Sequence, residues 1–131
     1  MALPLRYPRL WLVGGWLLIG LALLASLSPA QELPQVSGSD KLHHFIAYFS
    51  MTLWFAGVYP RTQYLWIGIA MVALGIFIEG AQSAMGLGRQ ADVYDLVANT
   101  SGVLVALIFA SMGLGRWTQW IENRLAGRSG A

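Results

Sequence analysis

The segment Tyr64–Met85, YLWIGIAMVALGIFIEGAQSAM, decides the fold class. It contains no basic residue, and a helix of this length, rising about 1.5 Å per residue, crosses the roughly 30 Å hydrocarbon core of a bilayer. Its one charged residue is Glu79, which stands with Gln82 near the end of the segment. The segment therefore predicts a membrane-spanning helix that carries an acidic side chain at intermediate depth.

Three further apolar runs, separated by polar or proline-containing stretches, repeat this pattern along the chain. We expect spans at about 10–27, 42–59, 64–85 and 93–114, followed by a polar tail at 116–131. The chain has 131 residues, of which 56% are hydrophobic and only 11% are charged. Soluble domains carry about a quarter of charged residues. The sequence thus predicts an all-α fold, a single membrane domain of four transmembrane helices.

The basic residues predict the orientation of this bundle, because positively charged loops stay cytoplasmic. Six of them flank the same predicted side: Arg6, Arg9, Arg61, Arg116, Arg124 and Arg128. Lys41 and Arg89 fall on the other side. Aromatic residues typical of a membrane interface gather on the arginine-rich side, at Tyr7, Trp11, Tyr59, Tyr64, Trp66, Trp117 and Trp120. Both signals predict that the two termini are cytoplasmic.

An alternative interpretation treats the N-terminal part as a signal peptide, cleaved after the small-x-small pattern Ser28-Pro29-Ala30. The apolar run before it is longer than the 7–15 residues usual for such a segment, which favours a retained span. The chain has no cysteine, so disulfides, thiolate nucleophiles and cysteine-bound metals are excluded. Its basic residues are scattered singly, so we expect no nucleic-acid partner.

Polar residues gather at the predicted outer ends of three spans. Asp40, His44 and Tyr48 share one helical face by the i, i+4 rule, and Lys41 stands beside them. Glu79 and Gln82 share a face of the third span. Asp92, Asp95, Asn99 and Gly102 form one stripe on the fourth span, and Arg89 lies in the loop before it. We expect these residues to meet at one membrane depth.

Structural explanations compete with functional ones for several of these residues. Asp92 and Asp95 have the spacing of a variant capping box, and Asp40 is a candidate N-cap. Asn99 is a candidate for hydrogen bonding between helices, a contact worth about 0.6 kcal/mol in membranes. His43 lies off the face of Asp40 and His44, so we expect it at the interface rather than in a site.

Glu79 is the hardest of these residues to explain structurally. An acidic side chain at the centre of a membrane helix costs about 2.5–3.5 kcal/mol on insertion scales, so it is normally paired, protonated or functional. The candidate partners are His44, Arg89 and Lys41. A Glu79–His44 pair would serve general-base chemistry or would orient a metal-ligating imidazole.

These motifs resemble the VanZ-like family of small bacterial membrane proteins. The resemblance rests on Asp40-Lys41-x-x-His44-Phe45-x-x-Tyr48, on Glu79-x-x-Gln82, and on Arg89 with Asp92, Asp95, Asn99 and Gly102. It covers about residues 40–109 and leaves out the first span and the tail. The resemblance implies that the matching polar residues are the site, that the membrane is the bacterial inner membrane, and that the site faces outward. The family is linked to glycopeptide (teicoplanin) resistance, which we do not transfer to this chain by default.

Two classes of function follow from this cluster. The first is a site that recognises or modifies a lipid or cell-envelope head group, with His44, Glu79 and Asp95 as candidate catalytic residues. Candidate substrate-binding residues are then Asp40, Lys41, Tyr48, Gln82, Arg89, Asp92 and Asn99. The second is a non-enzymatic accessory or binding protein, with a membrane protein or an envelope precursor as partner, whose polar ring mainly holds the helices together. Whether the chain is an enzyme stays open at this point.

The sequence identifies no cofactor. A divalent metal bound by His44, Glu79 and one of Asp92 or Asp95 is a further hypothesis, because three nitrogen and oxygen ligands suffice for such an ion. A transporter is disfavoured, since the polar residues stop halfway through the predicted membrane and the inner half is apolar.

Overall fold

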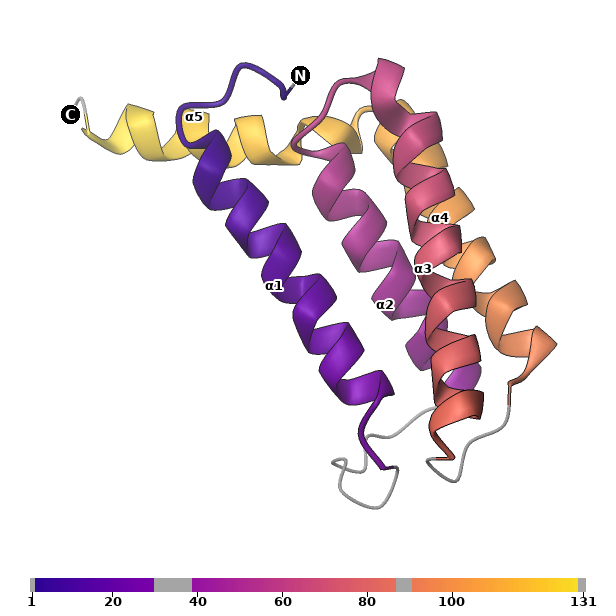
Figure 1. Ribbon diagram of the computed structural model, residues 1–131. Coiled ribbons are helices and arrows are strands. Elements are labelled where there is room, and N and C mark those ends of the chain that lie inside the picture. Colours follow the sequence, from indigo (N-terminus) through magenta and orange to yellow (C-terminus); the bar gives the residue numbers. More distant parts are fainter. Residues whose placement is uncertain (1, 30–38, 87–90, 130–131) are drawn as a thin grey trace.

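The computed structural model describes residues 2–29, 39–86 and 91–129, and within these residues the chain is all-helical, as predicted (Figure 1). The α-helices are α1 (Pro8–Ser26), α2 (Asp40–Ala56), α3 (Tyr64–Met85), α4 (Val93–Ser111) and α5 (Trp117–Ser129). The short 3₁₀ turns η2 (Arg61–Gln63) and η3 (Leu114–Arg116) lead into α3 and α5. The first four helices run up and down alternately, and α5 lies across the end of the bundle where α1 begins (Figure 1).

Three segments of the described chain are long and apolar enough to cross a membrane: Pro8–Ser26, Arg61–Met85 and Val93–Ser111. The second predicted span differs. It is the 17-residue helix α2, which ends at Ala56 rather than at Tyr59. At about 1.5 Å per residue this helix rises about 26 Å. Its first turns carry Asp40, Lys41, His43 and His44, so its apolar part is shorter still.

Local backbone geometry sets the helix ends. Pro8 opens α1, where its missing N–H leaves no hydrogen bond unmade. Gly86 ends α3 in the left-handed conformation, with φ 62°. The fourth span was predicted to reach Leu114, but α4 ends at Ser111, and Gly113 follows with φ 124°. Because only glycine adopts such a φ without strain, the chain turns there towards α5.

The core lies where α2 packs against α4, the most extensive contact between helices. Buried side chains there include Tyr48, Met51, Phe55 and Val103. Gly102 of α4 lies directly against the backbone of Phe45, whose carbonyl oxygen occupies the space that a Cβ atom would need. Large exposed apolar side chains are numerous on α1, α3 and α4, as on helices that face hydrocarbon, whereas α2 has them only in its first half, at Leu42 and Ile46. The second half of α2 is thus the part that the other helices enclose.

The predicted polar tail at 116–131 is helical over residues 117–129, which form α5. The helix docks through one face, on which Thr118 and Glu122 are buried. Thr118 donates a hydrogen bond to the carbonyl oxygen of Gly57, and Trp117 Nε1 donates one of 2.9 Å to the carbonyl oxygen of Leu53. The rest of the helix is largely exposed, and its apolar side chains Trp120, Ile121 and Leu125 lie among polar residues, so hydropathy gives only a weak signal for it.

Candidate functional site

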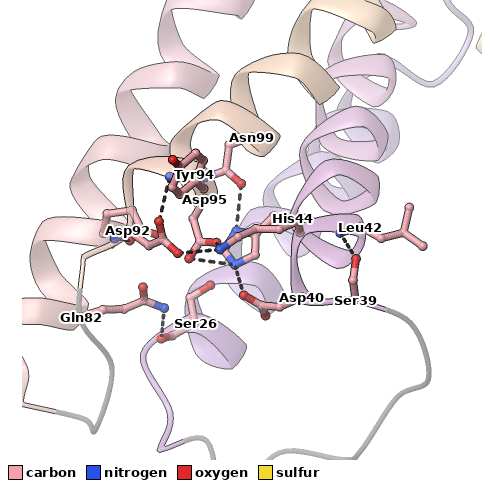
Figure 2. Close-up of polar contacts among 12 residues, drawn as sticks. Ser26, Ser39, Asp40, Leu42, His44, Gln82, Asp92, Tyr94, Asp95 and Asn99 are labelled. Atoms are coloured by element: carbon pink, nitrogen blue, oxygen red, sulfur yellow. Dashed lines mark hydrogen bonds and ion pairs between the residues drawn. The ribbon is translucent and has the colours of Figure 1, made fainter.

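The polar residues singled out in the sequence meet at the end of the bundle opposite α5 (Figures 1 and 2). We call the following described residues the polar cluster: Asp40, Lys41 and His44 of α2, Glu79 of α3, and Asp92, Asp95 and Asn99 at the start of α4. Two helix starts and one helix end therefore bring their polar side chains to one place. Arg89, predicted to overhang this site, lies outside the described residues.

The start of α2 fixes the first three members of the cluster. Ser39 caps the helix, its hydroxyl accepting a 3.1 Å hydrogen bond from the N–H of Leu42. The prediction of Asp40 as the N-cap is therefore wrong, because Ser39 already fills that role. Asp40 is instead the first helical residue and projects its carboxylate towards His44, one turn further on (Figure 2).

Lys41 joins α2 to α4 by binding two carboxylates. Its Nζ lies 2.7 Å from Asp92 Oδ2 and also contacts Asp95 Oδ1. The side chains of Lys41 and Asp92 are 43% and 40% exposed, whereas that of Asp95 is only 12% exposed. The hydrogen bond from Lys41, together with the N–H of Tyr94, holds the pKa of Asp92 below its usual value.

His44 lies beneath this ion pair, with its side chain 15% exposed. Its Nδ1 is 2.9 Å from Asn99 Oδ1. Its Nε2 faces two carboxylate oxygens, at 3.6 Å from Asp40 Oδ2 and 3.7 Å from Asp95 Oδ2 (Figure 2). The imidazole is therefore oriented by Asn99 on one side and directed at two acids on the other.

Glu79 is almost completely buried, with 3% of its surface exposed. Its Oε2 accepts a 3.2 Å hydrogen bond from the N–H of Asp92, whereas its Oε1 has no hydrogen-bond partner within the described structure. The predicted Glu79–His44 pair is not formed. Glu79 instead accepts a hydrogen bond from the backbone N–H of Asp92 at the start of α4. His44 is held by Asn99, so that its Nε2 faces Asp40 and Asp95.

The start of α4 departs from the predicted capping box. Asp92 is the N-cap, and its side chain accepts a 2.8 Å hydrogen bond from the N–H of Tyr94. In a capping box the third residue, here Asp95, would accept from the N–H of the cap. Glu79 of α3 takes that N–H instead. The carboxylate of Asp95 therefore contacts Lys41 and His44 of α2. These contacts join distant parts of the chain, so local sequence could not predict them.

Two predicted site residues lie apart from the centre of the cluster. Tyr48 shares the helical face of His44 but is 5% exposed and packs in the core beside Gly75. Gln82 is equally buried, and its Nε2 donates a 2.7 Å hydrogen bond to the carbonyl oxygen of Ser26, the last residue of α1 (Figure 2). Gln82 thus ties α3 to α1.

Three residues of the cluster could hold a metal ion. Asp40, His44 and Asp95 each offer one ligand atom, and these atoms lie within 4.8 Å of one another. The set differs from the predicted one, because Asp40 stands where Glu79 was expected. The i, i+4 spacing of Asp40 and His44 was the available signal for this pair.

At the opposite end, Glu122 of α5 has a function in the fold that the sequence analysis missed. Its carboxylate accepts hydrogen bonds from the N–H groups of Arg6 and Tyr7, at 2.6 and 3.0 Å, and from Trp11 Nε1 at 2.8 Å. The spacing of Thr118 and Glu122, one helical turn, is the only sequence signal that α5 would dock by one face.

Comparison with known proteins adds no relative: no family model, no curated protein and no solved structure matches this chain.

Proposed function

We propose that the polar cluster binds, and by acid–base chemistry modifies, the polar head group of a lipid or a lipid-linked cell-envelope precursor. One observation carries the proposal: exposure falls from Lys41 and Asp92 at the surface to His44, Asp95 and Glu79 within the bundle. A ligand at the membrane surface therefore meets charged groups first and the imidazole next.

Each residue has a role in this proposal that matches its contacts. His44, oriented by Asn99 and close to Asp95, is the candidate acid–base residue. Glu79 keeps one buried oxygen without a partner, which makes it available to a ligand proton. Lys41 and Asp92 position the head group. With Arg89 they correspond to the motifs by which the chain resembles the VanZ-like family, and membership of that family is part of the proposal.

The proposed setting is a bacterial inner membrane, with four spans, both termini in the cytoplasm and the polar cluster outside. The basic residues of α1, η2, η3 and α5 support this orientation, since they belong to elements at the α5 end. The fourth span is α2, enclosed by longer helices. Because the chain has no cysteine, single cysteines at Ser39 and Asn123 provide a direct test. An impermeant maleimide applied to intact cells should label S39C and not N123C; the reverse pattern would overturn the orientation.

The function is tested with full-length protein in nanodiscs made from a bacterial polar lipid extract supplemented with a polyprenyl phosphate. We expect native mass spectrometry to show one head-group class enriched on the wild-type protein, and a product of changed mass to accumulate with time. Glu79→Gln and His44→Ala should abolish turnover while the protein stays folded by circular dichroism.

Gly80→Ala is the matched control, because Gly80 neighbours Glu79 in α3 but a Cβ there meets nothing within 4 Å. It should behave as wild type. The proposal would be refuted if no head-group class were enriched on the wild type, or if both cluster variants turned over the lipid as fast as the wild type.

A second candidate, a non-enzymatic accessory protein, is favoured by a different observation. Lys41 already satisfies both Asp92 and Asp95, and so acts as a link between α2 and α4. In this case Lys41→Met should lower the melting temperature and release a co-purifying partner, and the wild type should show no turnover in the assay above.

A further inference from the structure

Three potential ligand atoms converge on a point between α2 and α4. Asn99 Oδ1 is a carbonyl oxygen and can only accept, so Nδ1 of His44 carries the hydrogen in their 2.9 Å contact. In the neutral imidazole the other nitrogen, Nε2, then presents a lone pair. That lone pair faces Asp40 Oδ2 and Asp95 Oδ2, so three acceptors point towards one another.

A shared proton does not fit this geometry. A hydrogen bond between Nε2 and a carboxylate oxygen needs about 2.7–3.2 Å, and both observed distances are longer, at 3.6 and 3.7 Å. A metal ion does fit. Nitrogen and oxygen ligands about 2.1 Å from a tetrahedral Zn²⁺ lie about 3.4 Å apart. The three ligand atoms lie within 4.8 Å of one another, and Asp40 is 69% exposed at the helix start, so its carboxylate is free to move towards an ion.

Neighbouring residues orient two of the three candidate metal ligands, His44 and Asp95, by hydrogen bonds. Metal-ligating histidines donate their second ring N–H to an oxygen, which fixes the tautomer, and Asn99 provides that oxygen. Asp95 is oriented in the same way: its Oδ1 is held by Lys41, which leaves Oδ2 for the ion. The four carboxylates of the polar cluster with Lys41 leave a formal charge of minus three, which a divalent ion reduces to minus one.

We propose that Asp40, His44 and Asp95 bind one divalent transition-metal ion of the Zn²⁺ or Mn²⁺ class, with Asn99 and Lys41 as positioning residues. One imidazole with two carboxylates suits these ions better than Ca²⁺ or Mg²⁺, which prefer oxygen ligands alone. Three protein ligands leave at least one position open to water or to a ligand's oxygen. This site uses His44 and Asp95 of the proposed head-group site, and His44 cannot act as an acid–base group while its Nε2 holds the ion. Metal binding is measured without any substrate, so each proposal can fail while the other stands.

The test uses the full chain without a polyhistidine tag, purified in detergent, stripped with EDTA and dialysed against Zn²⁺ or Mn²⁺. We expect one bound ion per chain by elemental analysis. In calorimetric titrations, Asp95→Asn and His44→Ala should each weaken binding at least tenfold. Asn99→Ala should weaken it by roughly 10–100-fold although Asn99 is no ligand, since it removes the group that orients His44.

Asp92→Asn is the matched control, because it removes a neighbouring carboxylate outside the ligand set and keeps the N-cap acceptor. It should change affinity less than threefold. The inference is overturned if the wild type binds no ion, if Asp95→Asn binds as tightly as the wild type, or if Asp92→Asn weakens binding as much as Asp95→Asn.

Co²⁺ bound to the wild type provides a second measurement that needs no variant to fold. An intense visible absorption band supports a four- or five-coordinate site with a protein imidazole. The weak spectrum of hydrated Co²⁺ at stoichiometric loading overturns the inference.

Discussion

The two ends of the bundle each bury a glutamate, and they satisfy it differently. At the α5 end, Glu122 accepts from Arg6, Tyr7 and Trp11, so both of its oxygens are bonded. At the polar end, Glu79 accepts one hydrogen bond, from Asp92, and its Oε1 has no partner among the described residues. The fold accounts for a buried carboxylate whose hydrogen bonds are complete, whereas one with an unbonded oxygen calls for a further explanation.

The residues near the two glutamates also differ: aromatic rings surround Glu122, and charged side chains lie near Glu79. Around Glu122, the rings of Trp11 and Trp54 each pack edge to face on Trp117 and are tilted against one another, with centroids 5.1–5.8 Å apart. Trp54 Nε1 donates to the carbonyl oxygen of Trp11, which closes this end further. Around Glu79, the carboxylates of Asp40 and Asp95 instead converge on His44. The α5 end is therefore closed by hydrogen bonds and aromatic packing, whereas the polar end gathers the charged groups to which we assign the proposed ligand site.

The largest effect should come from removing Glu122. Glu122→Ala leaves three donors at the start of α1 without their acceptor, and α1 has no side-chain cap of its own. Hydrogen bonds to a charged group contribute about 1.5–3 kcal/mol each, so we expect a loss of about 3 kcal/mol in the free energy of unfolding. Denaturation in detergent measures this, with the exposed Asn123→Ala as control. A loss no larger than that of the control would contradict the structural role of this end.

A smaller loss should follow from separating α2 and α4 below the polar cluster. Gly102→Ala places a methyl group against the carbonyl oxygen of Phe45, so the helices must move apart. Overpacking of this kind costs about 1–3 kcal/mol, and we expect about 2 kcal/mol. Gly80→Ala should be neutral or slightly stabilising, because its space is open and alanine favours helix. Similar melting temperatures for the two variants would show that the close contact is not required.

Acid should affect the α5 end through Glu122. Burial alone would raise the pKa of this carboxyl, but the hydrogen bonds from Arg6, Trp11 and Tyr7 outweigh it and lower the pKa below 4.5. A depressed pKa contributes stability above the unfolded value, and this is lost as pH falls through the folded value. Between pH 6 and pH 3.5 the melting temperature of the wild type should therefore fall a few degrees more than that of Glu122→Gln. An equal fall in both proteins would assign the acid sensitivity to other groups.

The smallest effect on stability is expected at Glu79. Glu79→Gln keeps an oxygen to accept the N–H of Asp92 and removes only a charge that lacks full hydrogen bonding. We expect the free energy of unfolding to change by less than about 0.5 kcal/mol, while head-group turnover is lost. The comparison between the two ends fails if Glu79→Gln destabilises the protein as much as Glu122→Ala does.

Much of the helical architecture was readable in the sequence, because apolar runs and turn-forming residues act locally. The third span was placed at 64–85, as α3 is observed. The start of α4 at Val93 and the cap at Asp92 were also correct. Errors fell where the local signal was weak: α2 ends earlier than its apolar run, and α5 has only a few apolar residues, at Trp117, Trp120, Ile121 and Leu125, among polar ones.

The sequence predicted which residues belong to the candidate site, but not which of them contact one another. Helical spacing grouped Asp40 with His44, and Asp92 with Asp95, because residues three or four apart share a face. Which face meets which depends on how the helices pack. The sequence analysis named His44 as a candidate partner of Glu79, whereas in the structure Glu79 accepts a hydrogen bond from the backbone N–H of Asp92.

By itself, the sequence determined that this protein is a bundle of apolar helices with its polar residues at one end, since hydropathy and helical period are properties of the chain alone. Only the tertiary structure decided that Lys41 joins Asp92 and Asp95, that His44 faces two carboxylates, and that Glu122 closes the far end. The reason is physical: hydrogen bonds and ion pairs act over a few ångströms, and only the packing of helices distant in sequence brings these groups within that range.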